Sequence, residues 1–218
     1  MRKIYVVGNG WSYTQWMQGD RIHNMKDADL VVFTGGEDID PKLYNRRAHQ
    51  YTNFNEDRDR YEVAAFKEAK ILGKKLIGIC RGAQLFCAMA GGILVQDSRH
   101  PNVHSMVTQS GKKIWVTSAH HQRQYPFVSH TGHQVKYEIL GYSENLSAYN
   151  FGESDRDKLL LQPEVEVAIY PEINALAIQS HPEWAYPAAN KWQKEFIDYC
   201  RKTLNRFMAT DYSQKAAA

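Results

Sequence analysis

Short apolar runs, separated by polar or helical stretches, recur along most of the chain. Each run has four to six residues, as buried strands do, and together they predict strands at 2–7, 30–34, 75–79, 93–96, 113–117, 135–140, 165–170 and 175–179. Between residues 55 and 72, apolar side chains recur at helical spacing between an acidic start and Gly73, which predicts a helix. Two further helices are predicted, one that ends at Gly91 and Gly92 and one over residues 187–208.

The order of these elements predicts the fold class. Strands alternate with helices early in the chain, which favours an α/β fold with a doubly wound, mostly parallel sheet. The middle of the chain is richer in strands and indicates a small antiparallel addition. A length of 218 residues fits a single domain, expected over residues 1–210, with a disordered tail at 211–218. Sheets of this kind bind ligands beyond the carboxyl ends of their strands.

One strand end carries a cysteine between glycines. The segment Gly78-Ile79-Cys80-Arg81-Gly82 ends a buried strand and opens an apolar helix, which is the pattern of a nucleophile elbow. Such a turn presents Cys80 at a helix N-terminus, where the helix dipole favours the thiolate. The backbone N–H of Arg81 is then well placed to stabilise an oxyanion. Taken alone, the segment also fits a small buried cysteine in an ordinary turn.

A second strand end leads into His181, Pro182 and Glu183. Pro182 favours extended geometry at His181, and in an extended chain residues two apart point to the same side. Glu183 can therefore fix the tautomer of His181 and stabilise its imidazolium, as the third member of a catalytic triad does. Taken alone, these residues also fit a hydrogen-bonded histidine beside a helix-capping glutamate. Together with the elbow they favour a Cys80, His181 and Glu183 triad.

A third strand end, after residue 34, carries Gly35 and Gly36. Paired glycines at such a position expose backbone N–H groups and leave room for a ligand, as in the second half of an oxyanion hole. A plain turn, marked by Asp40 and Pro41, explains the same residues. The pair alone is therefore weak evidence, and its interpretation depends on the other two strand ends.

Four segments occur together along most of the chain: F-T-G-G-E-D-I-D-P at 33–41, G-I-C-R-G-A-Q at 78–84, S-A-H-H-Q at 118–122 and Q-S-H-P-E at 179–183. In order and approximate separation this set resembles the class I glutamine amidotransferases and their relatives, the gamma-glutamyl hydrolases. The G-G-x-D-I-x-P form, the arginine in G-I-C-R-G and the H-H-Q stretch are more similar to the stand-alone gamma-glutamyl hydrolase branch. The resemblance implies a flavodoxin-like fold of the class I glutamine amidotransferase type.

The resemblance also implies roles for individual residues. It implies Cys80 as nucleophile, His181 as base, Glu183 as the partner that orients it, and oxyanion donors from Gly35, Gly36 and Arg81. It further implies that the substrate pocket is lined by Gln84 and by His121 or Gln122. The chain departs from the family pattern at Ser180, where an aromatic residue is usual. We place this difference near the substrate mouth, where it bears on the leaving group more than on the chemistry.

The expected reaction is cysteine-dependent hydrolysis of a gamma-glutamyl amide, either glutamine or a gamma-glutamyl amine, through a glutamyl thioester that releases glutamate. Three alternatives remain. The first is a glutaminase subunit that delivers ammonia to a separate synthetase. The second is a non-catalytic binding module on the same fold. The third is the related superfamily of intracellular proteases and glyoxalases, which shares the elbow but typically has histidine where this chain has Arg81.

Composition adds limits to these functions. Hydrophobic residues make up 43% of the chain and charged residues 23%, with a net charge of +3, which does not favour nucleic-acid binding. No apolar run is long enough to predict a membrane segment or a signal peptide. Three cysteines give no even disulfide framework, and a thiol nucleophile needs reducing surroundings, so we expect a cytoplasmic protein.

We expect neither a cofactor nor a metal. His100 and His104 have the i, i+4 spacing of metal ligands, but Pro101 interrupts the helix that this spacing needs, and no acidic cluster accompanies them. Two weaker features remain. Asp38 and Asp40 beside the glycine pair fit a cationic leaving group such as a polyamine, although a turn and helix cap is the default. The aromatic residues Trp11, Tyr13 and Trp16 fit a pocket wall, although core packing is more common.

Overall fold

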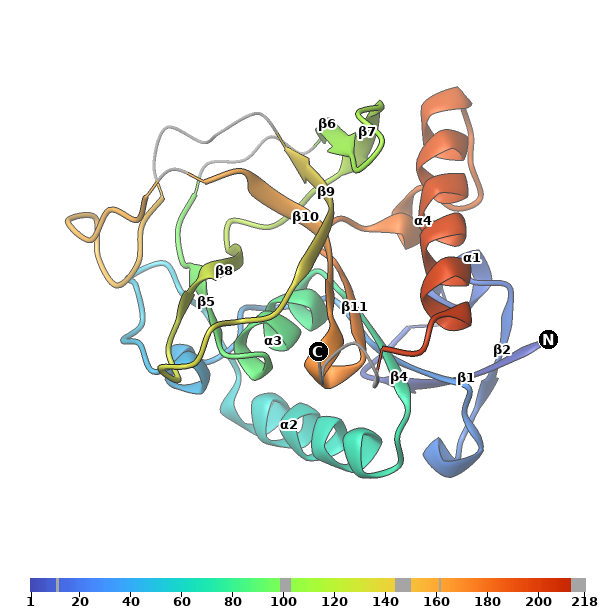
Figure 1. Cartoon of the computed structure of the whole chain (residues 1–218), viewed down its shortest axis with the longest axis horizontal. Coiled ribbons are helices and arrows are strands. Elements are labelled where there is room, and N and C mark those ends of the chain that lie inside the picture. Colours follow the sequence, from blue (N-terminus) through green and yellow to red (C-terminus); the bar gives the residue numbers. More distant parts are fainter. Residues whose placement is uncertain (11, 99–102, 144–149, 161, 213–218) are drawn as a thin grey trace.

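The computed structural model describes the whole chain except residues 11, 99–102, 144–149, 161 and 213–218 (Figure 1). Its centre is a nine-stranded sheet in the order β2-β1-β3-β4-β11-β10-β9-β6-β7. In that order the strands are Gly19–Ile22, Arg2–Val7, Leu30–Phe33, Lys75–Ile79, Ala175–Ile178, Glu164–Tyr170, Glu138–Ser143, Val103–Thr108 and Lys113–Thr117. A separate two-stranded sheet joins β5 (Gly92–Val95) and β8 (Arg123–Ser129).

The central sheet has a parallel half and an antiparallel half. The strands β2, β1, β3, β4 and β11 pair in parallel. The strands β10, β9, β6 and β7 continue the sheet in antiparallel pairs. This architecture confirms the expected α/β fold with its parallel core, and the antiparallel addition contributes four strands to the central sheet. The carboxyl ends of β3, β4 and β11 lie next to one another, because these three strands are neighbours in the order.

Helices cover both faces of the sheet (Figure 1). The helices α2 (Glu56–Ile71) and α3 (Arg81–Met89) pack on one face, where Phe66 and Phe86 belong to one hydrophobic core. The helices α1 (Ser12–Trp16) and α4 (Lys191–Ala209) pack on the other, where Trp16, Phe196 and Phe207 belong to a second core. Short 3-10 helices lie in the connections that the structure describes: η1 (Met25–Asp27), η2 (Pro41–Tyr44), η3 (Pro171–Ile173) and η4 (Pro182–Trp184).

Two glycines explain how α3 approaches the sheet so closely. A Cβ on Gly78 would lie 2.3 Å from the carbonyl carbon of Gly82, and a Cβ on Gly82 would lie 2.4 Å from the carbonyl oxygen of Phe33. Both distances are far inside van der Waals contact, so the strand, the turn and the helix meet only without side chains at these positions. This close packing fixes the start of α3 at the end of β4.

Most predicted elements are present, with boundaries shifted by a few residues. The prediction missed β2, β6 and β8. Strand β8 contains Pro126, which argues against a strand in sequence, yet it lies in the small sheet beside a register irregularity at Gly92 and Ile93. Tyr212, assigned to a disordered tail, is instead buried and stacks on Phe207. Residues 213–218 of that tail lie outside the described residues.

Among the residues that the structure describes, every helix is too short or too polar to span a membrane.

Candidate active site

Cys80 stands alone in a strained turn between β4 and α3. Its backbone has φ 51° and ψ −103°, in a region that residues other than glycine rarely adopt. The backbone N–H of Cys80 donates to the carbonyl of Ile178 at 2.8 Å, which continues the pairing of β4 with β11 beyond the end of the strand. The turn places Cys80 immediately before the helix N-terminus, as the elbow pattern predicts, and leaves the residue 5% exposed. A strained non-glycine residue at such a point is typical of a functional site.

His181 and Glu183 follow the neighbouring strand β11. The Nδ1 atom of His181 lies 2.7 Å from a carboxylate oxygen of Glu183, and both residues are 4% exposed. The thiol of Cys80 lies close enough to the imidazole to be among the causes of its raised pKa. The structure thus brings together the three side chains that the sequence predicts as a triad, in the order thiol, imidazole, carboxylate.

These contacts control the charge of His181. Burial alone would lower its pKa, but the hydrogen bonds and negative charges of Cys80 and Glu183 outweigh burial and raise the pKa from 6.5 to about 10. The imidazole is therefore protonated at neutral pH. A protonated imidazole in this position can give up a proton to a leaving group.

Two further residues hold His181 in place. Thr117, at the end of β7, accepts a hydrogen bond from the backbone N–H of His181 at 3.0 Å and donates its hydroxyl to the carbonyl of His181 at 2.8 Å. The indole of Trp184 stacks on the imidazole with 3.8 Å between ring centroids and an angle of 4° between the ring planes. Trp184 is 55% exposed, so it forms an outer wall over the imidazole.

The glycine loop after β3 lies directly against the triad. A Cβ on Gly35 would lie 3.0 Å from Cε1 of His181 and 3.6 Å from Cβ of Cys80. The N–H of Gly35, however, donates to the hydroxyl of Tyr13 at 3.0 Å. It is therefore already used in this structure, and Gly36 is the better placed donor of the pair. The N–H of Arg81 begins α3, where no earlier residue of the helix can accept from it.

Tyr13 links this loop to the triad. Burial, together with the nearby carboxylate of Glu183, raises the pKa of the Tyr13 phenol well above its usual range, so the phenol stays neutral. Tyr13 does not line the cleft beside Cys80 and packs in the same hydrophobic core as the fully buried Trp16, so both residues follow the core-packing interpretation. Trp11 lies outside the described residues.

Two arginines fix the glycine loop from α2 and α3. Arg58 donates to the carbonyl of Gly35 at 2.7 Å and pairs with Glu62 at 2.8 Å. Arg81 donates to the carbonyl of Glu37 at 2.9 Å and pairs with Asp59 at 2.7 Å and Glu62 at 3.0 Å. The side chains of Arg81 and Glu62 are at most 1% exposed. This network binds the carbonyls of Gly35 and Glu37 and so restrains the backbone of the glycine loop.

Sequence reasoning missed this network. It used only the backbone of Arg81 and interpreted residues 55–60 as a charged helix start. The usable signal was the side-chain charge of Arg81 itself, since an arginine inside an elbow that opens a buried helix needs acidic partners. Asp59 and Glu62, three residues apart on α2, supply them.

A cleft of about 170 Å³ opens beside Cys80. Its lining includes Gly36, Glu37, Asp38, Asn53, Gln84, Ala119, His120 and His121. Gln84 donates its amide to the carbonyl of Gln122 at 2.9 Å. The side chain of Gln122 is buried and donates to Thr52 at 3.0 Å, so it supports Gln84 and does not line the cleft. Ser180, which we placed near the substrate mouth, is instead fully buried.

His121 stands at the mouth of the cleft beside Asp38. Its Nε2 atom lies 3.1 Å from an Asp38 carboxylate oxygen, and this hydrogen bond is the main cause of a pKa raised above 6.5. Asp38 also accepts from the backbone N–H of Asn53 at 3.0 Å. Asp40 instead caps η2 through the N–H of Lys42, which is its default role. Of Asp38 and Asp40, Asp38 is thus the one that reaches the cleft.

Of the two histidines with metal-ligand spacing, the structure describes His104. His100 lies outside the described residues, and Nε2 of His104 is engaged by Glu166 at 2.9 Å. The described part of the chain holds one grouping with metal-ligand geometry, made of His49, Asp97 and Asp155. The imidazole of His49 already forms a hydrogen bond with Asp155 at 2.9 Å. Exposed acidic groups often cluster without an ion, so this grouping alone is not evidence of a metal centre.

The sequence profile described as Peptidase C26 matches residues 14–139, more than half of the chain. The chain belongs to the Peptidase C26 family. Membership indicates a hydrolase-type enzyme related to the glutamine amidotransferases. This Peptidase C26 protein is similar over most of its length to the glutamine amidotransferase-like protein YvdE of Lactococcus lactis subsp. lactis. The two sequences are 29% identical over 200 residues, which cover 85% of this chain and 80% of YvdE. A YvdE homolog of subsp. cremoris is 41% identical over 83 residues, and that match spans 36% of this chain and only 44% of the homolog.

Solved structures show the same fold. A glutamine amidotransferase of Thermotoga maritima superposes with a TM-score of 0.62 at 12% identity, over 96% of this chain and 99% of that one. A protein of Thermoplasma acidophilum, described as part of a GMP synthase, gives 0.56 at 16% identity, over 100% and 97% of the two chains. At such low identity these likenesses establish the architecture of this Peptidase C26 protein and not its substrate.

Proposed function

We propose that this protein hydrolyses a gamma-glutamyl amide through a thioester on Cys80. The observation that carries the proposal is the arrangement of three side chains. Glu183 is hydrogen-bonded to His181, the thiol of Cys80 is close enough to raise the pKa of His181, and Cys80 lines a cleft that can receive a substrate. Family membership supports hydrolase chemistry in general, and the cleft supports a small substrate.

The reaction follows from these contacts. The thiolate of Cys80 attacks the side-chain carbonyl carbon of the substrate and forms a carbon–sulfur bond. The N–H groups of Gly36 and Arg81 stabilise the tetrahedral oxyanion. The carbon–nitrogen bond then breaks as His181 gives its proton to the departing nitrogen. Water attacks the thioester, His181 takes a proton from that water, and the carbon–sulfur bond breaks to release glutamate and restore the thiolate.

The cleft lining supports an assignment of the substrate's parts. Gln84 and His121 line it and are proposed to bind the glutamyl group. Glu37 and Asp38 line it as well. Glu37 is paired with Arg58 and Asp38 is bonded to His121, and each carboxylate has a second oxygen that can accept from a positively charged group of the substrate. The free amino group of a glutamyl unit has such a charge, and so does the far end of a diamine leaving group. A gamma-glutamyl amine is therefore our preferred substrate class.

A panel of gamma-glutamyl compounds tests the proposal, with glutamate release as the readout. The panel contains glutamine, gamma-glutamyl derivatives of neutral amines, and gamma-glutamyl derivatives of diamines. We expect turnover of at least one member, and loss of all of it in Cys80→Ala. Cys87→Ala is the matched control, because Cys87 is a buried thiol on the same helix that lies outside the cleft. Hydrolysis that persists in Cys80→Ala would reject the mechanism.

A glutaminase subunit is the second candidate. One observation favours it: the chain superposes over 94% of its length, with a TM-score of 0.56 at 14% identity, on a structure described as PurLQS from Thermotoga maritima. A subunit of that kind would act on glutamine and deliver ammonia to a separate synthetase. Activity on glutamine that appears only when a partner is added would favour this candidate. Activity of the isolated chain on gamma-glutamyl amines would favour the hydrolase.

The third candidate, a non-catalytic binding module, makes a distinct prediction. A glutamine-like electrophile such as a chloroketone should then leave the protein unmodified. Covalent labelling at Cys80, found by mass spectrometry of the intact protein and its peptides, would show a reactive thiol and reject the module.

A further inference from the structure

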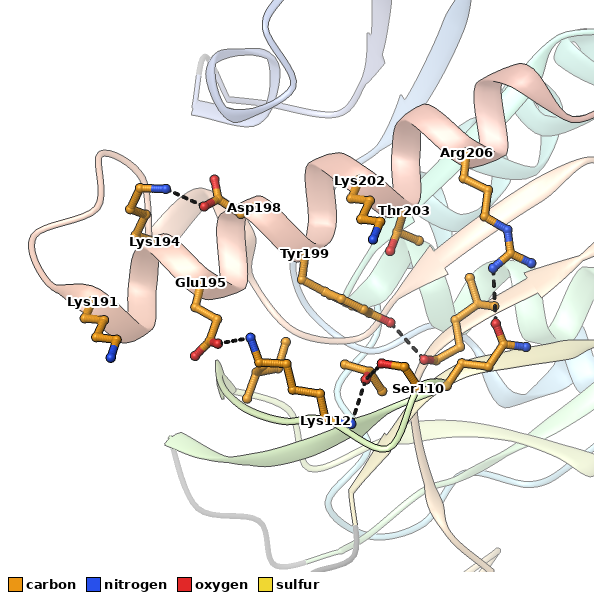
Figure 2. Close-up of a pocket in the computed structure, with 14 residues that line it drawn as sticks. Ser110, Lys112, Lys191, Lys194, Glu195, Asp198, Tyr199, Lys202, Thr203 and Arg206 are labelled. Atoms are coloured by element: carbon orange, nitrogen blue, oxygen red, sulfur yellow. Dashed lines mark hydrogen bonds and ion pairs between the residues drawn. The ribbon is translucent and has the colours of Figure 1, made fainter.

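A second hollow lies on the face of the sheet that α4 covers, between α4, the β6–β7 hairpin and β9 (Figure 2). Its volume is about 580 Å³, within the usual range for sites of drug-sized molecules. No residue that lines it also lines the cleft beside Cys80. We call this hollow the α4 groove.

The floor of the α4 groove is apolar and its walls are charged. Ile114 from β7 and Leu140 from β9 are 2% and 4% exposed and line the floor. The walls carry five basic and two acidic side chains: Lys112, Lys191, Lys194, Lys202, Arg206, Glu195 and Asp198. Arg206 also pairs with Glu138 at 2.9 Å, so two positive charges are in excess. An apolar surface with a surplus of cations favours a ligand that is both apolar and negatively charged.

The acids of the walls are already matched. Lys112 pairs with Glu195, and Lys194 pairs with Asp198 at 2.5 Å. No ion pair to another described residue engages Lys191 or Lys202, and Figure 2 shows Lys202 beside Thr203 and Tyr199 on the groove side of α4. Two ammonium groups are thus left to meet an incoming anion without breaking an existing pair.

Links across the α4 groove limit the shape of its occupant. Three side chains of α4 reach over to the hairpin or to β9: Glu195 pairs with Lys112, the hydroxyl of Tyr199 donates to the carbonyl of Leu140 at 2.9 Å, and Arg206 donates to Gln109 at 3.1 Å (Figure 2). An extended polypeptide laid along the floor would have to break several of these links. A compact molecule fits between them.

We propose that the α4 groove is a binding site for a small organic anion with an apolar body, of the aryl or acyl carboxylate, sulfonate or phosphate class. The apolar part lies against the half-buried Tyr199, over Ile114 and Leu140. The anionic group meets Lys202, and Lys191, about 16 Å away along α4, adds to the positive potential. The site is separate from the thiol cleft, so the inference does not depend on the proposed reaction.

Binding of 1-anilinonaphthalene-8-sulfonate tests the site, since this aromatic sulfonate has the required chemistry and fluoresces in apolar surroundings. We expect saturable binding of one molecule per chain. Lys191→Glu combined with Lys202→Glu should weaken it by on the order of tenfold or more, because two attractions become repulsions. Lys67→Glu, which reverses an exposed lysine on α2, is the matched control and should leave the affinity within twofold.

Competition separates the parts of the ligand. Decanoate and phenyl phosphate should displace the probe, whereas decylamine and inorganic phosphate at equal concentration should not. Three outcomes would overturn the site: no saturable binding, equal weakening by the double variant and by Lys67→Glu, or displacement by inorganic phosphate as effective as by decanoate. Thermal unfolding confirms that the variants are folded, and Lys202→Gln replaces the double variant if it is not.

Discussion

The thiol cleft and the α4 groove differ in what holds them together. The cleft depends on charged groups that are buried and bonded to one another, such as Arg81 with Asp59 and Glu62, whose side chains are at most 5% exposed. The groove depends on exposed pairs such as Lys112 with Glu195, whose side chains are 62% and 32% exposed. Buried charges that lose a partner are costly, while exposed pairs contribute little. The cleft is therefore expected to be rigid and intolerant of change, and the groove to be adjustable.

The largest expected effect comes from the triad. Glu183→Gln keeps the shape of the side chain but removes the charge that stabilises imidazolium, so kcat/KM for the best gamma-glutamyl substrate should fall by roughly 100- to 10,000-fold. Asp198→Asn, which removes an exposed carboxylate in the α4 groove, should leave kcat/KM within twofold. Steady-state kinetics measure both, and a Glu183→Gln enzyme within threefold of wild type would contradict the triad.

The buried network should dominate stability. Arg81→Met leaves the buried Asp59 without its cation and Glu62 with Arg58 alone, so the free energy of unfolding should fall by about 3–5 kcal/mol. Lys112→Met breaks one exposed pair in the groove and should cost about 0–1 kcal/mol. Urea denaturation followed by circular dichroism compares the two variants. Equal losses of unfolding free energy in the two variants would contradict the proposed difference in rigidity between the cleft and the groove.

The raised pKa of His181 predicts a pH dependence of stability. The group binds its proton more tightly in the folded state, with a pKa of about 10, than at its ordinary value of 6.5. Its contribution is complete below about pH 6.5, declines between 6.5 and 10, and is absent above 10. Urea midpoints across this range should fall with rising pH in the wild type, and fall less in His181→Gln. If the urea midpoints of wild type and His181→Gln fell in parallel with pH, His181 would not be the source of the pH dependence.

The smallest effect is expected from Trp184. Its stacking on protonated His181 resembles an exposed cation–π contact worth about 0.5–1 kcal/mol, so Trp184→Leu should lower kcat by about two- to fivefold. It should also lower the apparent pKa of the imidazole, and Trp184→Phe should restore most of both. The pH profile of kcat and NMR titration of His181 are the measurements. Equal behaviour of the leucine and phenylalanine variants would mean that the ring only fills space.

The same contrast explains how much the sequence could predict. Cys80, His181 and Gly35 each follow a buried strand, and neighbouring parallel strands bring their ends together, so local patterns sufficed for the core of the fold and for the triad. The resemblance to a family added the functions of these residues. The pairing of Arg81 with α2 was not visible, because the partners are joined by packing and not by spacing along the chain.

Other misses have related causes. Strand β6 mixes polar and apolar residues, including the buried His104, and strand β8 carries Pro126, so neither shows the alternation that predicts a strand. The α4 groove had no sequence signature at all. Its lysines are indistinguishable from ordinary surface charges until the helix is laid against the hairpin.

The register between β4 and β11 has one more consequence. Ile79 pairs with Ile178. Cys80 follows Ile79 directly, and His181 follows Ile178 by three residues and is held there by Thr117. A separation of a hundred positions along the polymer is thereby reduced to two neighbouring strands, which lie roughly 4.8 Å apart. Alignment of the reacting atoms is thus inherited from the backbone ladder and requires no late ordering of a flexible arm. Recovery of turnover after refolding should accordingly keep pace with amide-exchange protection in the middle of the sheet.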